Sequence, residues 1–111
     1  MFFQEAIDDT YQTLNEKYVL YQNYEKLLNK WLDSREMKIT SMQRFCFTFM
    51  LQSDLFGEST AGVEEVAYMM ECSTRTARKV LADVGNLVTF SKDGHKQIWH
   101  INLKELAKLE T

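Results

Sequence analysis

The chain contains no proline, only four glycines and only two cysteines among its 111 residues. Without proline, nothing in the sequence forbids long uninterrupted helices. Cys46 and Cys72 form neither a CxxC pair nor a disulfide framework, so we expect reduced thiols in a cytoplasmic protein. No apolar run approaches the roughly 18 residues that cross a bilayer, and no basic segment precedes an apolar stretch at the N-terminus. We therefore expect no membrane partner and no secretory signal.

The sequence also lacks the motifs of common catalytic sites, such as GxSxG, a P-loop or HExxH. Two adjacent acidic pairs, at residues 8–9 and 64–65, are poor acid/base pairs because neighbours on a helix point in different directions. His95 and His100 have no Cys, Asp or His partner at the spacing of metal ligands. We therefore expect that the chain is not an enzyme and has no metal site and no cofactor.

Positive charge is scarce and is concentrated in one segment. The net charge is −3, and residues 1–71 hold six basic and twelve acidic residues. Residues 72–100 hold five basic and only two acidic residues. A local basic patch sets the potential that a phosphate backbone meets, so a negative net charge does not exclude a nucleic-acid partner.

Residues 3–32 predict one long helix, because apolar residues recur at alternating spacings of four and three over almost four heptads. This pattern favours a dimerisation helix over residues 1–35. Other aromatic residues lie off the seam and widen the apolar face, so the alternative is that the helix packs on its own chain. The expected dimerisation residues are Ile7, Tyr11, Leu14, Tyr18, Tyr21, Leu28 and Leu32, with Glu25 as the one polar interruption.

Three shorter helical patterns follow a polar joint at residues 33–39. Thr40 or Ser41 can cap a helix that runs to about residue 56, where Gly57 ends it. The segment VEEVAYMM at residues 63–70 predicts the second of these helices. A short turn separates it from the third, a basic helix that begins at residue 73 or 74 and runs toward Gly85.

Two strands and a short helix complete the pattern. Residues 87–90 and 97–101 are β-rich and are separated by SKDGHK, with Asp93-Gly94 at the tip. Asn102 can cap a closing helix. The predicted fold is mostly α, with a long N-terminal helix followed by a winged helix-turn-helix domain over residues 40–111 that carries a two-stranded wing.

The segment from residue 62 to 109 resembles the C-terminal DNA-binding domain of the Crp/Fnr regulator family. Ser73, Thr76, Lys79 and Leu81 fall on that family's S-x-x-T-x-x-[RK]-x-L spacing, and QRFCFTFML resembles the helix that opens the domain. The family's cyclic-nucleotide-binding barrel normally precedes the long helix, and we expect no such barrel within these 111 residues. Where the family usually has glycine in the turn, this chain has Glu71, so we expect an unusual backbone angle there.

The resemblance implies a sequence-specific, dimeric, Crp-like transcription regulator that binds double-stranded DNA and can contact RNA polymerase. We expect the helix at residues 74–84 to enter the major groove, with Arg75 reading guanine. One alternative is that the cations form a solvated face; another is that the winged helix binds a protein of the polymerase or replication machinery. The expected DNA-binding residues are Ser73, Thr74, Arg75, Thr76, Arg78, Lys79, Lys92, His95 and Lys96.

Overall fold

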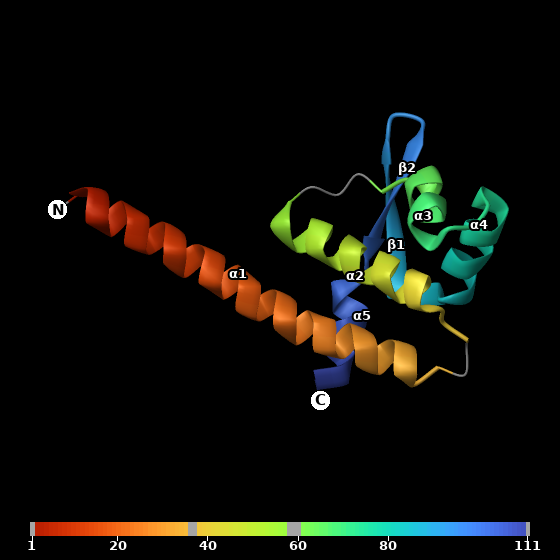
Figure 1. Ribbon diagram of the computed structural model, residues 1–111, viewed down its shortest axis with the longest axis horizontal. Helices are drawn as coiled ribbons and strands as arrows, with labels where there is room; N and C mark the ends of the chain where they lie inside the picture. The colour runs from red at the N-terminus through yellow and green to blue at the C-terminus, as the bar shows by residue number, and fades with distance from the viewer. Residues whose placement is uncertain (1, 36–37, 58–60, 111) are drawn as a thin grey trace.

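The computed structural model describes the backbone of residues 2–35, 38–57 and 61–110, with side chains from residue 15 onward. The chain is mostly helical with one two-stranded antiparallel sheet (Figure 1), which confirms the predicted winged helix-turn-helix fold. None of the helices in the described ranges is long and apolar enough to cross a membrane. The elements are α1 (Phe2–Asp33), α2 (Ser41–Phe56), α3 (Val63–Met70), α4 (Thr74–Asp83), a 3₁₀ turn (Gly85–Leu87), β1 (Val88–Asp93), β2 (Lys96–Ile101), α5 (Leu103–Ala107) and a second 3₁₀ turn (Lys108–Glu110).

Helix α2 begins and ends where its local sequence dictates. The Thr40 hydroxyl accepts a hydrogen bond from the Gln43 backbone N–H at 3.1 Å, and the Gln43 side chain accepts one from the Thr40 backbone N–H at 3.0 Å. This capping box satisfies two N–H groups that would otherwise lack partners. At the other end Gly57 has φ 91°, the left-handed conformation in which glycine commonly ends a helix.

The corner between α3 and α4 is built on a residue other than glycine. Glu71 has φ 55°, which confirms the unusual backbone angle expected from the sequence. Its backbone N–H donates to the Tyr68 carbonyl, and the Cys72 backbone N–H donates to the Ala67 carbonyl at 3.0 Å. These bonds satisfy carbonyl groups at the end of α3 and fix the turn, at the cost of the strain that a side chain meets in this conformation.

The wing is longer and its turn tighter than the sequence pattern indicated. The strands run from Val88 to Asp93 and from Lys96 to Ile101, and Asp93 pairs with Lys96. Gly94 and His95 alone form the turn, and Gly94 has φ 65°. A type II′ hairpin turn requires a positive φ at the first of its two turn residues, and glycine usually occupies that position.

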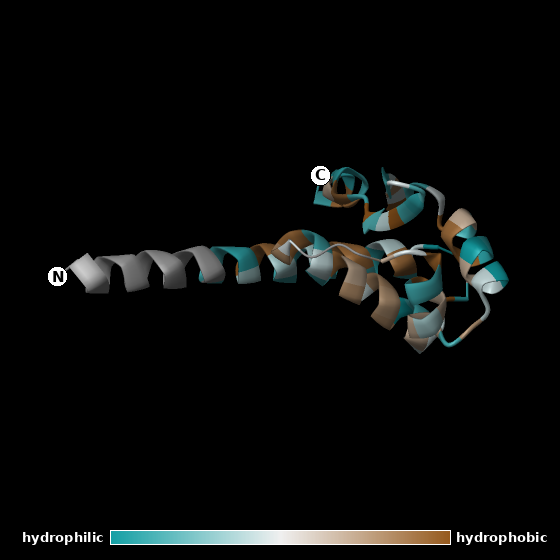
Figure 2. Cartoon of the chain, turned by 90° about the horizontal axis from the view of Figure 1, so that it is seen from above, coloured by the Kyte–Doolittle hydropathy of each residue, from teal (hydrophilic) through white to brown (hydrophobic). Residues whose placement is uncertain are grey.

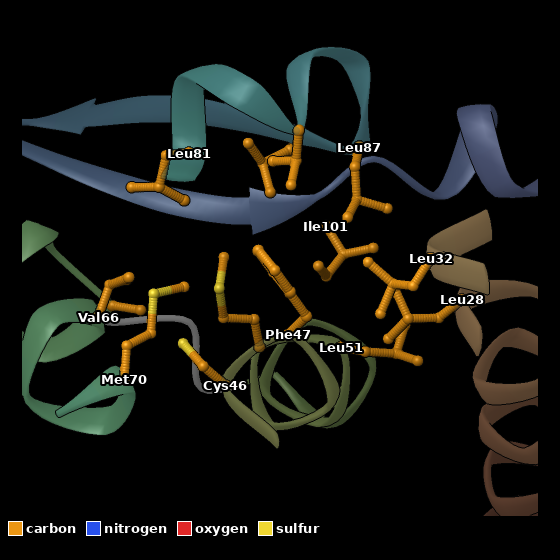
Figure 3. Close-up of a cluster of buried hydrophobic side chains, with 14 of the residues drawn as sticks. Leu28, Leu32, Cys46, Phe47, Leu51, Val66, Met70, Leu81, Leu87 and Ile101 are labelled. Atoms are coloured by element: carbon orange, nitrogen blue, oxygen red, sulfur yellow. The ribbon is translucent and has the colours of Figure 1, made fainter. Parts of the chain in front are cut away.

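The core lies around α2, which packs against α1, α3 and β2. Phe47 and Leu51 are completely buried, and their neighbours in Figure 3 point toward them from α1, α3, α4 and β2. The labelled side chains of this cluster are Leu28, Leu32, Cys46, Phe47, Leu51, Val66, Met70, Leu81, Leu87 and Ile101.

The structure corrects the expected role of three dimerisation residues. Tyr21, Leu28 and Leu32 are 8%, 0% and 2% exposed because α1 packs against α2 and α5 of the same chain. A partner subunit cannot reach side chains that the chain itself covers. The alternative of packing within the chain is therefore confirmed for residues 21–32, and brown and teal residues alternate along this packed half of α1 in Figure 2.

The other half of α1 extends beyond the rest of the chain (Figure 1). Every residue from 15 to 20 is exposed, and the apolar Tyr18, Val19 and Leu20 are 54%, 47% and 45% exposed. The side chains of the predicted dimerisation residues Ile7, Tyr11 and Leu14 lie outside the described part of the structure.

Arg44 joins the packed end of α1 to α2. Its guanidinium donates to Asn29 Oδ1 at 2.7 Å and to Asp33 Oδ1 at 2.8 Å. Asn29 and Asp33 lie one turn apart on α1, so the two NH2 groups of one guanidinium can bind both side chains at once. Arg44 thereby links α2 to two successive turns of α1.

Candidate nucleic-acid interface

Helix α4 begins with a capping arrangement that engages two of the expected DNA-contacting hydroxyls. Ser73 Oγ accepts a hydrogen bond from the Thr76 backbone N–H at 3.2 Å and donates to Thr76 Oγ1 at 3.0 Å. The cap satisfies one of the N–H groups that a helix leaves open at its start. Ser73 and Thr76 therefore define the first turn of α4, and both side chains remain exposed.

The two faces of α4 differ as the sequence predicts. Ala77 and Leu81 are buried and pack the helix against the core. The opposite face is exposed, as expected for a face left to solvent or to a ligand. Its exposed side chains are Thr74, Arg75, Arg78 and Lys79.

A recess of about 450 Å³ lies between α3, α4 and the wing. Arg78 reaches it from α4, and Lys92, His95 and Lys96 reach it from the wing. The structure thus brings together four expected contact residues from two elements that are separated in the sequence. The expected residues Thr74, Arg75 and Lys79 do not line this recess but lie on the same exposed helix.

Lys96 is engaged in an ion pair within this recess. Its Nζ donates to Glu65 Oε1 on α3 at 2.6 Å, and both side chains are about half exposed. This hydrogen bond raises the pKa of Lys96 and lowers the pKa of Glu65. A Cβ at Gly62 would lie 2.6 Å from Lys96 Cε, so the absence of a side chain there leaves room for the lysine. The pair joins the base of the wing turn to the start of α3.

A second set of polar contacts holds the other end of the wing. Asp54 Oδ1 of α2 accepts from His100 Nδ1 at 2.8 Å, and Asp54 Oδ2 accepts from the Ile101 backbone N–H at 2.7 Å. The other ring nitrogen, Nε2, lies within hydrogen-bond distance of Ser91 Oγ, 2.8 Å away. His100 thereby links α2 to both strands of the wing.

Sequence reasoning missed both sets of contacts. Glu65 and Lys96 are 31 residues apart, and Asp54 and His100 are 46 residues apart. His100 lacks an acidic partner at a local spacing, but the fold provides one. Within the described ranges, no group of three or more His, Cys, Asp or Glu side chains is arranged to hold a metal ion.

Comparisons with known proteins give a likeness to a solved structure. No family model and no curated protein matches the chain. Among solved structures, the chain is similar to the solution NMR structure of the homodimeric winged helix-turn-helix DNA-binding domain of a possible ArsR-family transcriptional regulator from Mycobacterium bovis. The TM-score is 0.46 at 21% sequence identity, over 84% of this chain and 76% of that chain. The fold assignment accordingly rests on the order and packing of this chain's own helices and strands.

Proposed function

We propose that the chain is a sequence-specific DNA-binding transcriptional regulator that places α4 in the major groove. The observation that carries this proposal is the exposed face of α4, whose Arg78 meets the wing cations Lys92 and Lys96 around one recess. These cations belong to residues 72–100, which hold five basic and two acidic residues in a chain of net negative charge. A helix with a basic outer face fits the major groove of B-DNA, and cations beside it can neutralise the adjacent phosphates.

The residues of α4 and the wing have different roles in this proposal. Arg75 lies in the first turn of α4, where its guanidinium can form two hydrogen bonds to the O6 and N7 atoms of guanine. Arg78 lies where α4 meets the wing, and Lys92 contacts the phosphate backbone. Lys96 contacts phosphate by exchanging its ion pair with Glu65 for a phosphate oxygen. The Ser73 hydroxyl, which caps α4, and the Thr76 hydroxyl, to which it donates, contact phosphate from the helix start. This arrangement is the one that the Crp/Fnr resemblance implies for α4.

We further propose that two copies bind one near-palindromic site through the extending half of α1. The side chains of Tyr21, Leu28 and Leu32 are covered within the chain, so the proposed contact is limited to Ile7, Tyr11, Leu14 and Tyr18. Tyr18 is 54% exposed and continues the same seam. Two recognition helices related by a two-fold axis would read half-sites about one turn of DNA apart.

A selection of bound fragments from a random double-stranded library tests DNA reading. The wild-type chain should enrich a two-fold motif, whereas the triple variant Arg75→Ala, Arg78→Ala, Lys79→Ala should enrich none. The triple variant Lys26→Ala, Lys30→Ala, Lys104→Ala is the matched control, because it removes the same charge from exposed positions outside α4 and the wing. Equal loss of enrichment in both triple variants would refute the assignment of α4 as the reading element.

Salt dependence separates DNA binding from the alternative that the winged helix binds a protein. Binding through several phosphates weakens steeply with salt, by about 10³-fold or more between 50 and 200 mM for a protein with six or more phosphate contacts. Lys92→Ala should lower affinity for every DNA sequence and reduce this slope by about one. Absence of any enriched DNA would favour a protein of the polymerase or replication machinery as the partner.

The dimer requires its own measurement. Removing residues 1–32 is unsuitable, because Leu28, Trp31 and Leu32 belong to the core. The double variant Leu14→Glu, Tyr18→Glu leaves that core intact and should sediment as a monomer at concentrations at which the wild type sediments as a dimer. The same mass for the wild type and the variant would remove the proposed role of α1.

A further inference from the structure

Helices α2 and α3 together expose an apolar surface. We define the α2–α3 surface as Met42, Phe45 and Phe49 of α2 with Tyr68 and Met69 of α3. Phe45, Phe49 and Tyr68 are 59%, 45% and 85% exposed, although large aromatic side chains usually lie inside a protein. Exposed aromatic side chains that gather on one face are typical of an interaction site.

Two recesses lie side by side on this surface. One, of about 340 Å³, has Phe49 and Ala61 in its lining, and the other, of about 750 Å³, has Met42 and Phe45 in its lining. Tyr68 and Met69 line both recesses, so the two form one continuous surface rather than separate pockets. Adjacent recesses along two packed helices suit the successive apolar side chains of a helix laid across them.

The rim of the α2–α3 surface is acidic. Glu64 and Glu65 lie at the smaller recess and Glu71 at the larger one, and among the described residues no lysine or arginine lines either recess. Glu65 is paired with Lys96, so Glu64 and Glu71 carry the charge of the rim. This negative charge would repel the extending half of α1 from a second copy, because residues 2–20 contain four acidic residues and one lysine. A second copy is therefore disfavoured as the occupant of this surface.

We propose that the α2–α3 surface binds an amphipathic helix of another protein, with apolar side chains in the two recesses and lysine or arginine facing Glu64 and Glu71. Arg75, Arg78 and Lys79 line neither recess, whereas Ser73 at the start of α4 lines the larger one, and Glu64 and Glu65 line both the smaller recess and the recess beside the wing. The proposal does not depend on DNA binding, and each can fail without the other.

Two synthetic peptides of about four helical turns serve as probes, with the same leucine stripe but with flanks of lysine in one and of glutamate in the other. Fluorescence anisotropy with the full chain should show tighter binding of the lysine peptide. Tyr68→Ser should weaken that binding by about tenfold or more, as expected for an aromatic residue at the centre of an interface. Its side chain is 85% exposed, so the change leaves the core unaltered.

Val19→Ser is the matched control, because Val19 is an exposed apolar residue of α1 outside the α2–α3 surface. It should leave binding of the lysine peptide unchanged. Glu64→Gln should weaken the binding of the lysine peptide and should not weaken the binding of the glutamate peptide. The proposal is overturned if the two peptides bind equally or not at all, or if Val19→Ser weakens binding as much as Tyr68→Ser. It is also overturned if Tyr68→Ser halves the sedimenting mass, since the surface would then join two copies.

Discussion

Replacing Asp54 with alanine should loosen the wing from the body of the domain. The Asp54 side chain is 10% exposed and its two oxygens accept hydrogen bonds from His100 Nδ1 and from the Ile101 backbone N–H. Alanine removes both acceptors at once. The backbone N–H of Ile101 then loses its hydrogen-bond acceptor. Ile101 is only 4% exposed, so this N–H lies in a buried part of the protein.

The expected loss follows from these two bonds. A hydrogen bond to a charged group contributes about 1.5–3 kcal/mol, and leaving a buried donor without a partner costs about 1–3 kcal/mol. Because these effects overlap, we expect the free energy of unfolding to fall by about 3 kcal/mol. For a domain of this size that corresponds to a decrease in Tm of about 12 °C.

Urea unfolding followed by tryptophan fluorescence measures this loss, since Trp31 lies in the core and Trp99 lies on β2. Asp83→Ala removes the same charge from an exposed position and should change stability by less than about 0.5 kcal/mol. A double-mutant cycle with His100→Ala should give a coupling of about 1–2 kcal/mol. If Asp54→Ala is as stable as Asp83→Ala, the wing is not held by this carboxylate and the reasoning is refuted.

Three further variants or reagents test other parts of the fold. Glu71→Gly should raise the free energy of unfolding by about 0.5 kcal/mol, because relief of the left-handed strain exceeds the added freedom of the unfolded chain. A lower free energy of unfolding, measured by urea unfolding, would contradict this. Burial raises the pKa of Cys46 to about 12, so at pH 8 a thiol reagent should modify Cys72 first and Cys46 only on unfolding, as peptide mass mapping would show. Leu28→Ala should cost about 3 kcal/mol at every protein concentration, since Leu28 packs within the chain; a cost that changed with concentration would place it at a subunit contact.

The local sequence was sufficient to predict most helix boundaries. The Thr40 capping box, Gly57 after α2 and the Ser73 cap of α4 are signals that act over three or four residues, and each ends or starts a helix as expected. The orientation of α4 also followed from its own pattern, because the apolar residues on one side leave the cations on the other.

The packing of α1 could not be predicted in the same way. A stripe of apolar residues shows that a helix has a covered face, but it does not show whether the cover is a second copy or the same chain. The stripe runs through the sequence with Glu25 as its one polar interruption, yet Tyr21, Leu28 and Leu32 are buried and Tyr18 is exposed. Trp31 lies off the seam and is nevertheless 3% exposed, because α1 is covered from more than one side.

The contacts that orient the wing could not be predicted from the sequence either. Asp54 and His100 meet only because α2 and β2 pack together, and neither residue belongs to a local motif. The wing strands were predicted too short because Ser91, Lys92 and Lys96 are polar, although exposed positions of a hairpin readily hold polar residues.

Helix α2 serves two surfaces at once, since Asp54 holds β2 while Phe45 and Phe49 face outward on the α2–α3 surface. Whatever shifts α2 along its axis also shifts the anchor of the wing. A helix bound on one side and DNA bound on the other would therefore act on a shared rigid element. Thermodynamic linkage then requires reciprocity: if the bound helix changes the affinity for DNA by some factor, DNA changes the affinity for the helix by the same factor.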